Sequence, residues 1–294
     1  MSAYWYQHNK VLKDSKSFKH KLKINFMARM IGPFTVIGRL GNVSVYKRKG
    51  SDEVFVRMKG GPSAETIKKS PSMQNLREHN IEFGGCGRSG GLIKDATDPV
   101  SYLRDFNIVS EFNSYCTSLL PFDTTSLHGE RAISFSKGRS LLEGFNFNRP
   151  VTLDSVLRTP IYCTVSRDTC SASIDLPEVV PEINFYPPAN NALYRFLLSF
   201  CIINDMIYEK GMGYIPLVEA GSQTSFFPKQ IYTDWQKIDN TMAARRIDMN
   251  IPDVSIGETT SILLAEGIEL RTSKQGDSTA VRKNGGFGKI LAFR

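Results

Sequence analysis

Apolar and polar side chains alternate in two short runs near the N-terminus, and this alternation predicts two paired β-strands. A turn sequence, Lys-Gly-Ser-Asp at residues 49–52, separates the runs. Because successive side chains of a strand point to opposite faces of its sheet, Tyr46 and Phe55 are expected on one face. The other face is expected to hold four valines: Val43, Val45, Val54 and Val56. The pattern therefore predicts a β-hairpin.

Helical spacing replaces the alternation after this hairpin. A first helix is predicted to begin near Pro71, because Leu76 and Phe83 belong to a stripe with steps of three and four residues. A second helix is predicted from Pro99 to about Pro121. Its stripe comprises Tyr102, Leu103, Phe106, Val109 and Phe112. These elements form a predicted hairpin-and-helix module over residues 31–125.

From about residue 132, short apolar or alternating runs are separated by Pro, Gly, Asn and Asp at intervals of roughly ten residues. This spacing is typical of antiparallel β-sandwiches. Near the C-terminus, a turn at residues 274–277 predicts a hairpin between residues 267–273 and 278–283. The predicted fold is α+β: an N-terminal β-hairpin and two helices, followed by an antiparallel β-sandwich over residues 126–294.

Positive charge is concentrated in the first quarter of the chain. The formal net charge is +8. Residues 1–70 contain fifteen Lys and Arg against four acidic residues, whereas the remainder contains twenty-two against twenty-five. A basic region can bind nucleic acid, an anionic membrane surface or an acidic partner through charge pairing and counterion release. The alternative is a disordered leader over residues 1–30 that is simply solvated.

The leader has no apolar segment and no small-residue cleavage site of the kind found in secretory signals. Met27 and Met30 are alternative translation starts, in which case the leader would not be part of the protein. The longest apolar run, residues 196–203, is too short to span a bilayer. We therefore expect a cytoplasmic protein without a membrane span.

The stretch EFGGCGRSGGLIKDA contains the spacing Gly85-x-Gly87-x-x-Gly90 of dinucleotide-binding loops. Such loops follow a strand, and the phosphate lies at the N-terminus of the next helix. Here the preceding residues are predicted to be helical, so we expect no nucleotide site. Two alternatives remain: a helix whose small residues at Gly84, Gly87 or Ser89, and Gly91 admit a neighbouring backbone, or a break between two helices. Each glycine costs a helix roughly 0.5–1 kcal/mol relative to alanine, which favours the break.

Residue types that often carry catalysis or bind metals are scattered along the chain. The four histidines include no pair at i, i+4 spacing, and His79 is predicted to be a surface residue rather than a ligand. The five cysteines form no C-x-x-C motif. Cys116 lies in apolar sequence, where burial makes a thiol inert. We predict that the protein is not an enzyme and has no cofactor or metal site.

The hairpin provides the candidate contact residues. Exposed strand edges carry unpaired backbone groups that can pair with a second copy or a partner. We predict a structural or interaction protein that forms a homo-oligomer or larger assembly, or docks a protein partner, through the hairpin and the sandwich edges. The predicted protein contacts are Gly41, Asn42, Val43, Tyr46, Val54, Val56 and Arg57.

The alternative function is nucleic-acid binding without sequence preference, in which basic groups follow the backbone and aromatic rings stack on bases. The predicted contacts for this function are Lys47, Arg48, Lys49 and Lys59. The competing interpretation is that the hairpin aromatics pack against the helices and the lysines are solvated. A third option is a carbohydrate-binding or hydrolytic sandwich, with Tyr232 and Trp235 as its aromatic residues.

Two segments resemble a group of uncharacterised proteins of Bacteroidetes bacteria. That group has a Gly-x-x-Gly-Asn-hydrophobic-x-x-Tyr hairpin followed by a helical segment with Arg-Glu-x-Asn and Glu-Phe-Gly. The matching residues here are Gly38, Gly41, Asn42, Val43 and Tyr46, then Ile67, Lys68, Pro71, Arg77, Glu78, Asn80, Glu82, Phe83 and Gly84. The closing segment, residues 267–294, is similar to the last hairpin of the group. The resemblance implies an architecture and a phylum but no catalytic residues, because the group has no assigned activity.

Overall fold

The chain divides into two compact units, Met1–Thr66 and Ile67–Arg294. The computed structural model describes residues 27–29, 37–48, 50–58, 60–219, 228–252, 254–272 and 285–294, so that most of the predicted leader lies outside it. The division falls after the hairpin and not near residue 125. The physical reason is that the segment predicted to hold two helices shares one hydrophobic core with the strands that follow.

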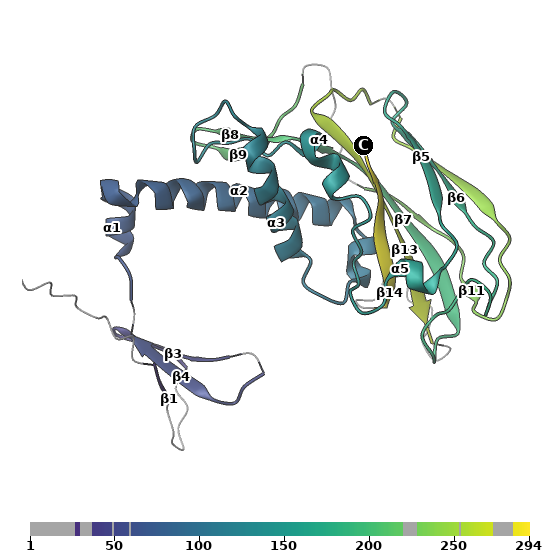
Figure 1. The fold of residues 1–294 in the computed structure, drawn as a ribbon, viewed down its shortest axis with the longest axis horizontal. Helices are drawn as coiled ribbons and strands as arrows, with labels where there is room; N and C mark the ends of the chain where they lie inside the picture. Colours follow the sequence, from purple (N-terminus) through teal and green to yellow (C-terminus); the bar gives the residue numbers. More distant parts are fainter. Residues whose placement is uncertain are drawn as a thin grey trace, which may run out of the picture. The chain divides into compact units, whose positions relative to one another are not determined.

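The first unit contains an antiparallel sheet of four strands (Figure 1). They are β1 (Met27–Arg29), β2 (Gly38–Leu40), β3 (Val43–Lys47) and β4 (Val54–Met58), in the spatial order β1-β4-β3-β2. The predicted hairpin is confirmed as β3 and β4, because Tyr46 lies opposite Phe55 in their register. A two-residue turn joins β2 to β3, and there Gly41 has a φ of 55°, a conformation that favours glycine.

One long helix, α2 (Gln74–Ala96), and the shorter α3 (Val109–Leu119) dominate the helical part of the second unit. The remaining helices are one or two turns long: α1 (Ala64–Lys69), which crosses the boundary between the units, η1 (Pro71–Met73), η2 (Val100–Leu103), η3 (Leu120–Phe122), α4 (Phe135–Gly138), η4 (Arg139–Leu141) and α5 (Leu153–Val156). The predicted first helix is thus α2.

The predicted second helix is wrong in its extent. The chain forms only the short η2 after Pro99, leaves helical geometry at Arg104, and starts α3 at Val109. The proposed apolar stripe is divided accordingly. Leu103 and Phe112 are fully buried, whereas Tyr102 is 45% exposed, because residues separated by a non-helical step no longer share one helix face.

A central antiparallel sheet forms the middle of the second unit. Its strands are β10 (Lys229–Tyr232), β7 (Leu193–Asn204), β13 (Thr260–Arg271) and β14 (Gly286–Phe293) in that order, and β11 (Gln236–Lys237) also pairs with β7. The predicted hairpin partner at residues 278–283 lies outside the described residues. In the described part, β13 pairs with β14 on one side and β7 on the other.

Two smaller antiparallel sheets accompany it. One contains β12 (Arg245–Asn250), β6 (Ser171–Leu176) and β5 (Tyr162–Ser166), in that order. The other is the pair β8 (Met206–Glu209) and β9 (Gly213–Pro216). The structure therefore confirms an α+β fold with antiparallel sheets, and it distributes the strands of the second unit over several sheets.

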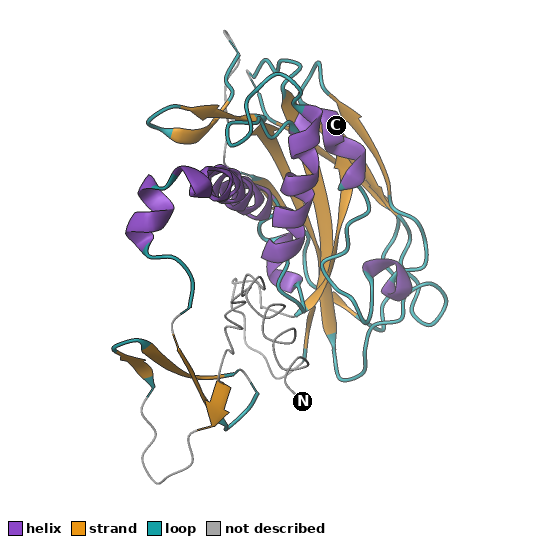
Figure 2. Cartoon of the chain, turned by 60° about the vertical axis from the view of Figure 1, so that its left-hand side comes forward, coloured by secondary structure: helices purple, strands orange, loops and turns teal. Residues whose placement is uncertain are grey.

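Both faces of the central sheet are covered. Leu197, Cys201 and Ile203 of β7 join a cluster with residues of α2 and α3. The alternate residues of β7, such as Phe196 and Phe200, join a second cluster with residues of β5, β6 and β12. Figure 2 shows the long helix α2 and the helix α3 on one side of the orange central strands. Because both faces are buried, β7 has a nearly continuous apolar sequence from Phe196 to Ile203, interrupted only by Ser199, instead of an alternating one.

None of the described helices combines the length and the apolar character needed to cross a bilayer.

Candidate functional site

The N-terminal sheet has an apolar face. Leu40 lies opposite Val43, and Val43 lies opposite Met58, so that these three residues form a row across β2, β3 and β4. Leu40 and Met58 keep 74% and 66% of their surface exposed, whereas Val45 and Val54 farther along the same face are buried. We call Leu40, Val43 and Met58 the apolar row. It is an exposed hydrophobic strip on three adjacent strands.

The opposite face combines aromatic rings with arginines. The rings of Tyr46 and Phe55 lie with their centroids 6.0 Å apart. The guanidinium of Arg48 lies 4.4 Å from the centre of the Phe55 ring, and that of Arg57 lies 5.4 Å from the centre of the Tyr46 ring. Cation–π contacts of this kind contribute about 0.5–1 kcal/mol at exposed sites. We call these four residues the basic-aromatic face.

The residues predicted to contact a protein partner are divided between the two faces. The apolar face holds Val43, Val54 and Val56. Tyr46 and Arg57 belong to the basic-aromatic face, and Gly41 and Asn42 form the exposed turn between β2 and β3. A single partner surface cannot contact all of these residues, because the two groups lie on opposite faces of the sheet.

The residues predicted to contact nucleic acid are also separated. Arg48 belongs to the basic-aromatic face. Lys47 lies opposite Val54 on the apolar side, and its ammonium is 3.7 Å from a carboxylate oxygen of Asp52. Lys49 and Lys59 lie outside the described residues. Arg57, which was predicted as a protein contact, lies on the same face as Arg48.

The glycine-rich stretch lies inside α2, which is continuous, so the predicted break is wrong. Packing explains the continuity. A Cβ on Gly85 would lie 2.4 Å from the ring of Tyr214, and a Cβ on Gly90 would lie 2.5 Å from Oδ1 of Asn113 on α3. These glycines let β9 and α3 approach the helix closely, and the contacts offset its low intrinsic stability. Their amides belong to the helix interior and do not form a phosphate loop.

The glycines predicted to serve this packing are not the ones that do. A Cβ on Gly84, Gly87 or Gly91 would meet nothing within 4 Å. The buried stripe of α2 instead comprises Glu82, Gly85, Cys86, Ser89, Gly90, Ile93 and Ala96. The apolar residues Leu76 and Phe83, which suggested the helix, are 40% and 67% exposed. The spacing therefore identified the helix but assigned the wrong face to the core.

The same stretch also contains Gly87-x-Ser89-x-Gly91, the spacing of a nucleophile elbow. A nucleophile elbow needs a serine exposed on a sharp turn between a strand and a helix. Ser89 lies within α2, is fully buried, and its hydroxyl oxygen has no hydrogen-bond partner among the described residues. It is a packing residue and not a nucleophile.

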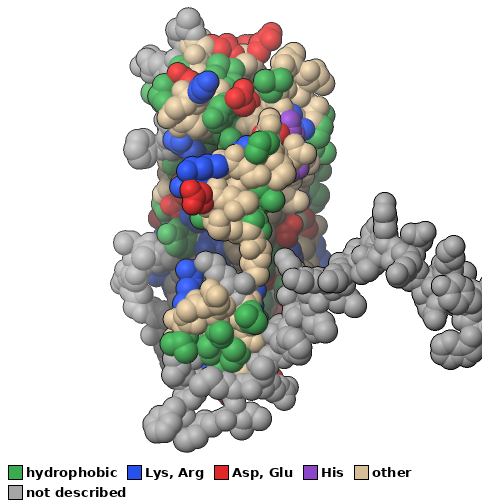
Figure 3. Space-filling model, turned by 90° about the vertical axis from the view of Figure 1, so that its left-hand side faces the viewer, with side chains coloured by type: hydrophobic (Ala, Val, Ile, Leu, Met, Phe, Trp, Pro, Cys, Tyr) green, Lys and Arg blue, Asp and Glu red, His purple; other side chains and the backbone are tan. Residues whose placement is uncertain are grey.

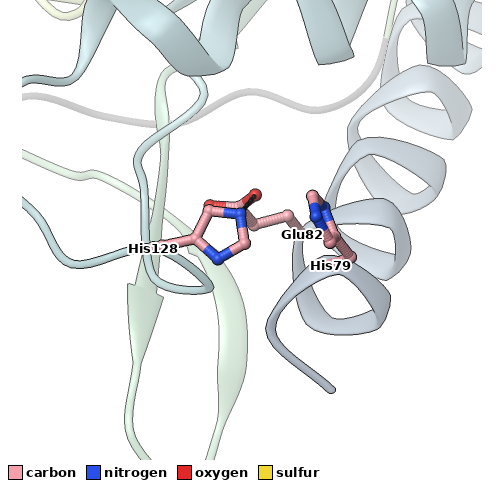
Figure 4. A group of neighbouring side chains, drawn as sticks. All are labelled: His79, Glu82 and His128. Carbon is pink, nitrogen blue, oxygen red and sulfur yellow. Dashed lines mark ion pairs between the residues drawn. The ribbon is translucent and has the colours of Figure 1, made fainter. Parts of the chain in front are cut away.

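Two histidines that are far apart in the sequence meet beside α2. His79 and Glu82 lie three residues apart on the helix, and the loop after η3 brings His128 next to them (Figure 4). The imidazole rings lie edge to face, with centroids 4.6 Å apart. One nitrogen or oxygen atom of each of the three residues lies within 4.8 Å of the others. Both histidines are exposed. Figure 3 shows purple histidine side chains on the molecular surface.

Glu82 is the buried member of this cluster, with a side chain that is 3% exposed. Arg131 donates from Nε to Oε1 and from Nη2 to Oε2, each at 2.7 Å, and the amide of Gly129 donates to Oε1 at 2.9 Å. Burial acts to raise the pKa of Glu82, but these hydrogen bonds outweigh it and lower the pKa. Glu82 is therefore a fixed, ionised carboxylate.

Glu78 orients His128 from the next turn of the helix. Nδ1 of His128 lies 2.9 Å from Oε2 of Glu78, and Gln74 donates to Oε1 of the same carboxylate at 2.9 Å. The hydrogen bonds with His128 and Gln74 lower the pKa of Glu78. An ionised carboxylate only accepts hydrogen bonds, so Nδ1 of His128 carries the proton. Nε2 of His128 then faces Oε2 of Glu82 at 3.7 Å.

A hollow of about 470 Å³ opens beside the cluster. Its walls include His79, Glu82, Cys86, Thr117 and Arg131. Burial raises the pKa of the Cys86 thiol, and it does the same for Cys116, as the sequence predicted for that residue. Neither thiol is a reactive group.

The third option, a carbohydrate site at Trp235, is not supported by the packing. The guanidinium groups of Arg195 and Arg271 lie 4.6 Å and 4.4 Å from the centre of the indole ring. Both arginines also pair with the buried carboxylate of Glu269. The ring face needed for stacking on a sugar is used within the protein.

Comparisons of the chain with protein-family models, with curated proteins and with solved structures found no match. The resemblance to the Bacteroidetes group therefore stays a prediction.

Sequence reasoning missed the cluster of His79, Glu82 and His128, because contact between α2 and a distant loop leaves no local spacing. The one signal available was the i, i+3 pair of His79 and Glu82, which places a nitrogen and an oxygen ligand on the same helix face.

Proposed function

We propose that this is a non-enzymatic interaction protein that binds a second copy of itself through the apolar face of its N-terminal sheet. The observation that carries the proposal is the apolar row. Leu40 and Met58 are among the most exposed large hydrophobic residues of the described chain, although they lie on regular strands. Covering a leucine or methionine side chain stabilises a complex by about 1.5–3 kcal/mol.

The charge distribution favours packing of face on face over pairing of edges. Pairing of β2 with β2 of a second copy, centred on Arg39, would place two Arg39 side chains opposite each other, which is unfavourable. Packing two apolar rows together leaves both basic-aromatic faces pointing outward. A four-stranded sheet with strands of three to five residues also gains the second layer that such short strands need.

In this proposal the second unit is the scaffold that carries the sheet. We propose that its central sheet and the sheet of β5, β6 and β12 form a β-sandwich, because one hydrophobic cluster contains residues of both. The cytoplasmic location predicted from the sequence is part of the same proposal.

A second candidate function is sequence-tolerant binding of single-stranded nucleic acid to the basic-aromatic face. Two adjacent aromatic rings lie beside Arg48 and Arg57, whose side chains are exposed, unlike those of the buried arginines over Trp235. In this second candidate function the guanidinium groups move from the rings to phosphates, and bases stack in their place. Arg39, opposite Ser44, adds positive charge to the same face. This function uses the side of the sheet that self-association leaves free.

One pair of variants tests both functions, because the two faces are independent. Leu40→Ser/Met58→Ser removes the apolar row, and Arg48→Gln/Arg57→Gln removes charge from the other face. We expect the first variant to weaken self-association in sedimentation velocity by at least about tenfold, with little change for the second. For a labelled oligothymidine at low salt, fluorescence anisotropy should show the reverse order of effects, and binding should weaken as salt rises.

Each variant is the control for the other, and both alter exposed side chains, so that folding is expected to be retained. A wild-type monomer at all concentrations would refute self-association. Unchanged anisotropy of the oligonucleotide at low salt would refute nucleic-acid binding.

A further inference from the structure

The side chains of His79, Glu82 and His128 have the composition and spacing of a metal site. Their potential ligand atoms are two imidazole nitrogens and one carboxylate oxygen, all within 4.8 Å of one another. A tetrahedral ion with bonds of about 2.0–2.1 Å holds its ligand atoms about 3.4 Å apart. The present separation of 3.7 Å between Nε2 of His128 and Oε2 of Glu82 is close to that value.

Glu78 prepares His128 for this role. Its Oε2 accepts a hydrogen bond from Nδ1–H of His128, with 2.9 Å between the two heavy atoms. In the neutral imidazole Nε2 then carries the lone pair, and it faces Glu82. Metal-binding histidines in proteins commonly donate their second ring N–H to a carboxylate in this way. At 3.7 Å, Nε2 and Oε2 are too far apart for a hydrogen bond. In the neutral form of the imidazole, Nε2 and Oε2 therefore face each other as two acceptor atoms.

Glu82 supplies a fixed oxygen ligand. Oε1 accepts from both Arg131 and the amide of Gly129, whereas Oε2 accepts only from Arg131 among the described residues. Oε2 is also the oxygen that lies nearest to His128. The two hydrogen bonds from Arg131 fix the position of the carboxylate. They leave Oε2 with a lone pair that can bind an ion.

We propose that His79, Glu82 and His128 bind one divalent transition-metal ion, with Zn²⁺ as the preferred ion. Two nitrogens and one oxygen suit Zn²⁺ better than Mg²⁺ or Ca²⁺, which take oxygen ligands. Both histidine side chains are exposed, so rotation of the rings brings their nitrogens onto the ion. The loop that carries His128 packs closely against α2, because Gly129 has no Cβ. A Cβ there would lie 2.9 Å from Cβ of Glu78.

Three protein ligands leave a fourth position for water or another small ligand. This position faces the hollow of about 470 Å³ beside the cluster. Arg131 lines the same hollow, so that a small anion bound to the ion would also meet a positive charge. The site is thus an exchangeable metal site at the surface of the second unit, distinct from the N-terminal sheet.

The test is calorimetric titration of Zn²⁺ into the full chain in the presence of a phosphine reductant. We expect one high-affinity ion per chain, and His79→Ala and His128→Ala should each weaken its binding by at least about tenfold. Glu78→Ala, which changes no ligand, should weaken it by about tenfold because the imidazole loses its orienting acceptor. Bound Co²⁺ should show the intense visible absorption of a four-coordinate ion.

Two controls separate this site from other donors of the chain. His8→Ala/His20→Ala removes the remaining histidines, and Glu130→Gln removes an exposed carboxylate next to Gly129. Both should bind Zn²⁺ like the wild type. Metal-free unfolding midpoints of the His79 and His128 variants should match the wild type, since both side chains are exposed.

The proposal is overturned if the wild type shows no saturable binding. It is equally overturned if His79→Ala and His128→Ala bind as tightly as the wild type, because the ion would then be held elsewhere.

Discussion

The N-terminal sheet and the central sheet of the second unit are both antiparallel, but their surroundings are opposite. Strands β7 and β13 are twelve residues long and buried almost throughout, with α2 and α3 on one face and α5, β5, β6 and β12 on the other. Strands β3 and β4 are five residues long, and each has one buried residue. The N-terminal sheet exposes the apolar row. In the central sheet, every apolar side chain of β7 and β13 is buried except that of Leu193, which is partly exposed.

The difference shows that a sheet is stable within its own chain when other elements of that chain cover both of its faces. The hydrophobic clusters of the second unit begin at Cys86 and include no residue of the first unit. The central sheet is therefore complete, and its energetics depend on internal packing. The N-terminal sheet has little core of its own, so its apolar face is available to a partner.

The largest effect on the free energy of unfolding is expected from replacing Glu266, which lies in β13 of the central sheet. Its side chain is fully enclosed, and Oε2 has no hydrogen-bond partner among the described residues. Lys289 lies opposite on β14, but its ammonium pairs with Asp154 at 2.8 Å. Burial raises the pKa of Glu266 from 4.5 to about 8. The native state thus keeps a proton that the unfolded chain releases above pH 4.5.

The free energy of unfolding should therefore fall as pH rises between these two values, by about 1.4 kcal/mol per pH unit. Glu266→Gln removes the ionisation, and we expect it to raise this free energy by about 3–4 kcal/mol at about pH 9 and by less at about pH 6. Urea unfolding at both pH values measures the effect, with the exposed Glu130→Gln as control. An equal effect at the two pH values would contradict the buried-acid explanation.

A smaller effect is expected for the helix that covers the central sheet. Gly90→Ala pushes a methyl group against Asn113 and the backbone of Phe112, and should destabilise the protein by about 1–3 kcal/mol. Gly91→Ala, one residue away, meets nothing within 4 Å and should stabilise it by about 0.5–1 kcal/mol. Thermal unfolding of the two variants gives the comparison. If both change stability in the same direction, packing of α2 against α3 does not explain the glycines.

The smallest effect is expected when the N-terminal sheet is removed. Deleting residues 1–62 should change the unfolding free energy of the remaining chain by less than about 0.5 kcal/mol, because neither cluster of the second unit loses a residue. Trp235 is then the only tryptophan and reports this unit alone by fluorescence. A large loss of stability would show that the two units share a core after all.

Local sequence patterns predicted the elements that depend on contacts between residues close together in the sequence. The hairpin of β3 and β4 is correct in its two faces, since the period of two assigns Tyr46 and Phe55 to one side and the four valines to the other. The existence of α2 was also predicted, but its buried face was not. Phe83 looked like a core residue and is exposed, whereas Gly85 and Gly90 form contacts that only a neighbouring element could reveal.

The sequence by itself determined the class of the fold, the N-terminal hairpin with its apolar and basic-aromatic faces, and the uneven charge. These follow from short-range periodicity and composition, which do not require knowledge of what lies across the core. Tertiary structure alone decided that the glycine-rich stretch is one helix, since its contacts with Tyr214 and Asn113 offset the cost of the glycines. It also decided that His128 meets His79 and Glu82, because ligand atoms from a helix and a distant loop converge only when the chain is folded.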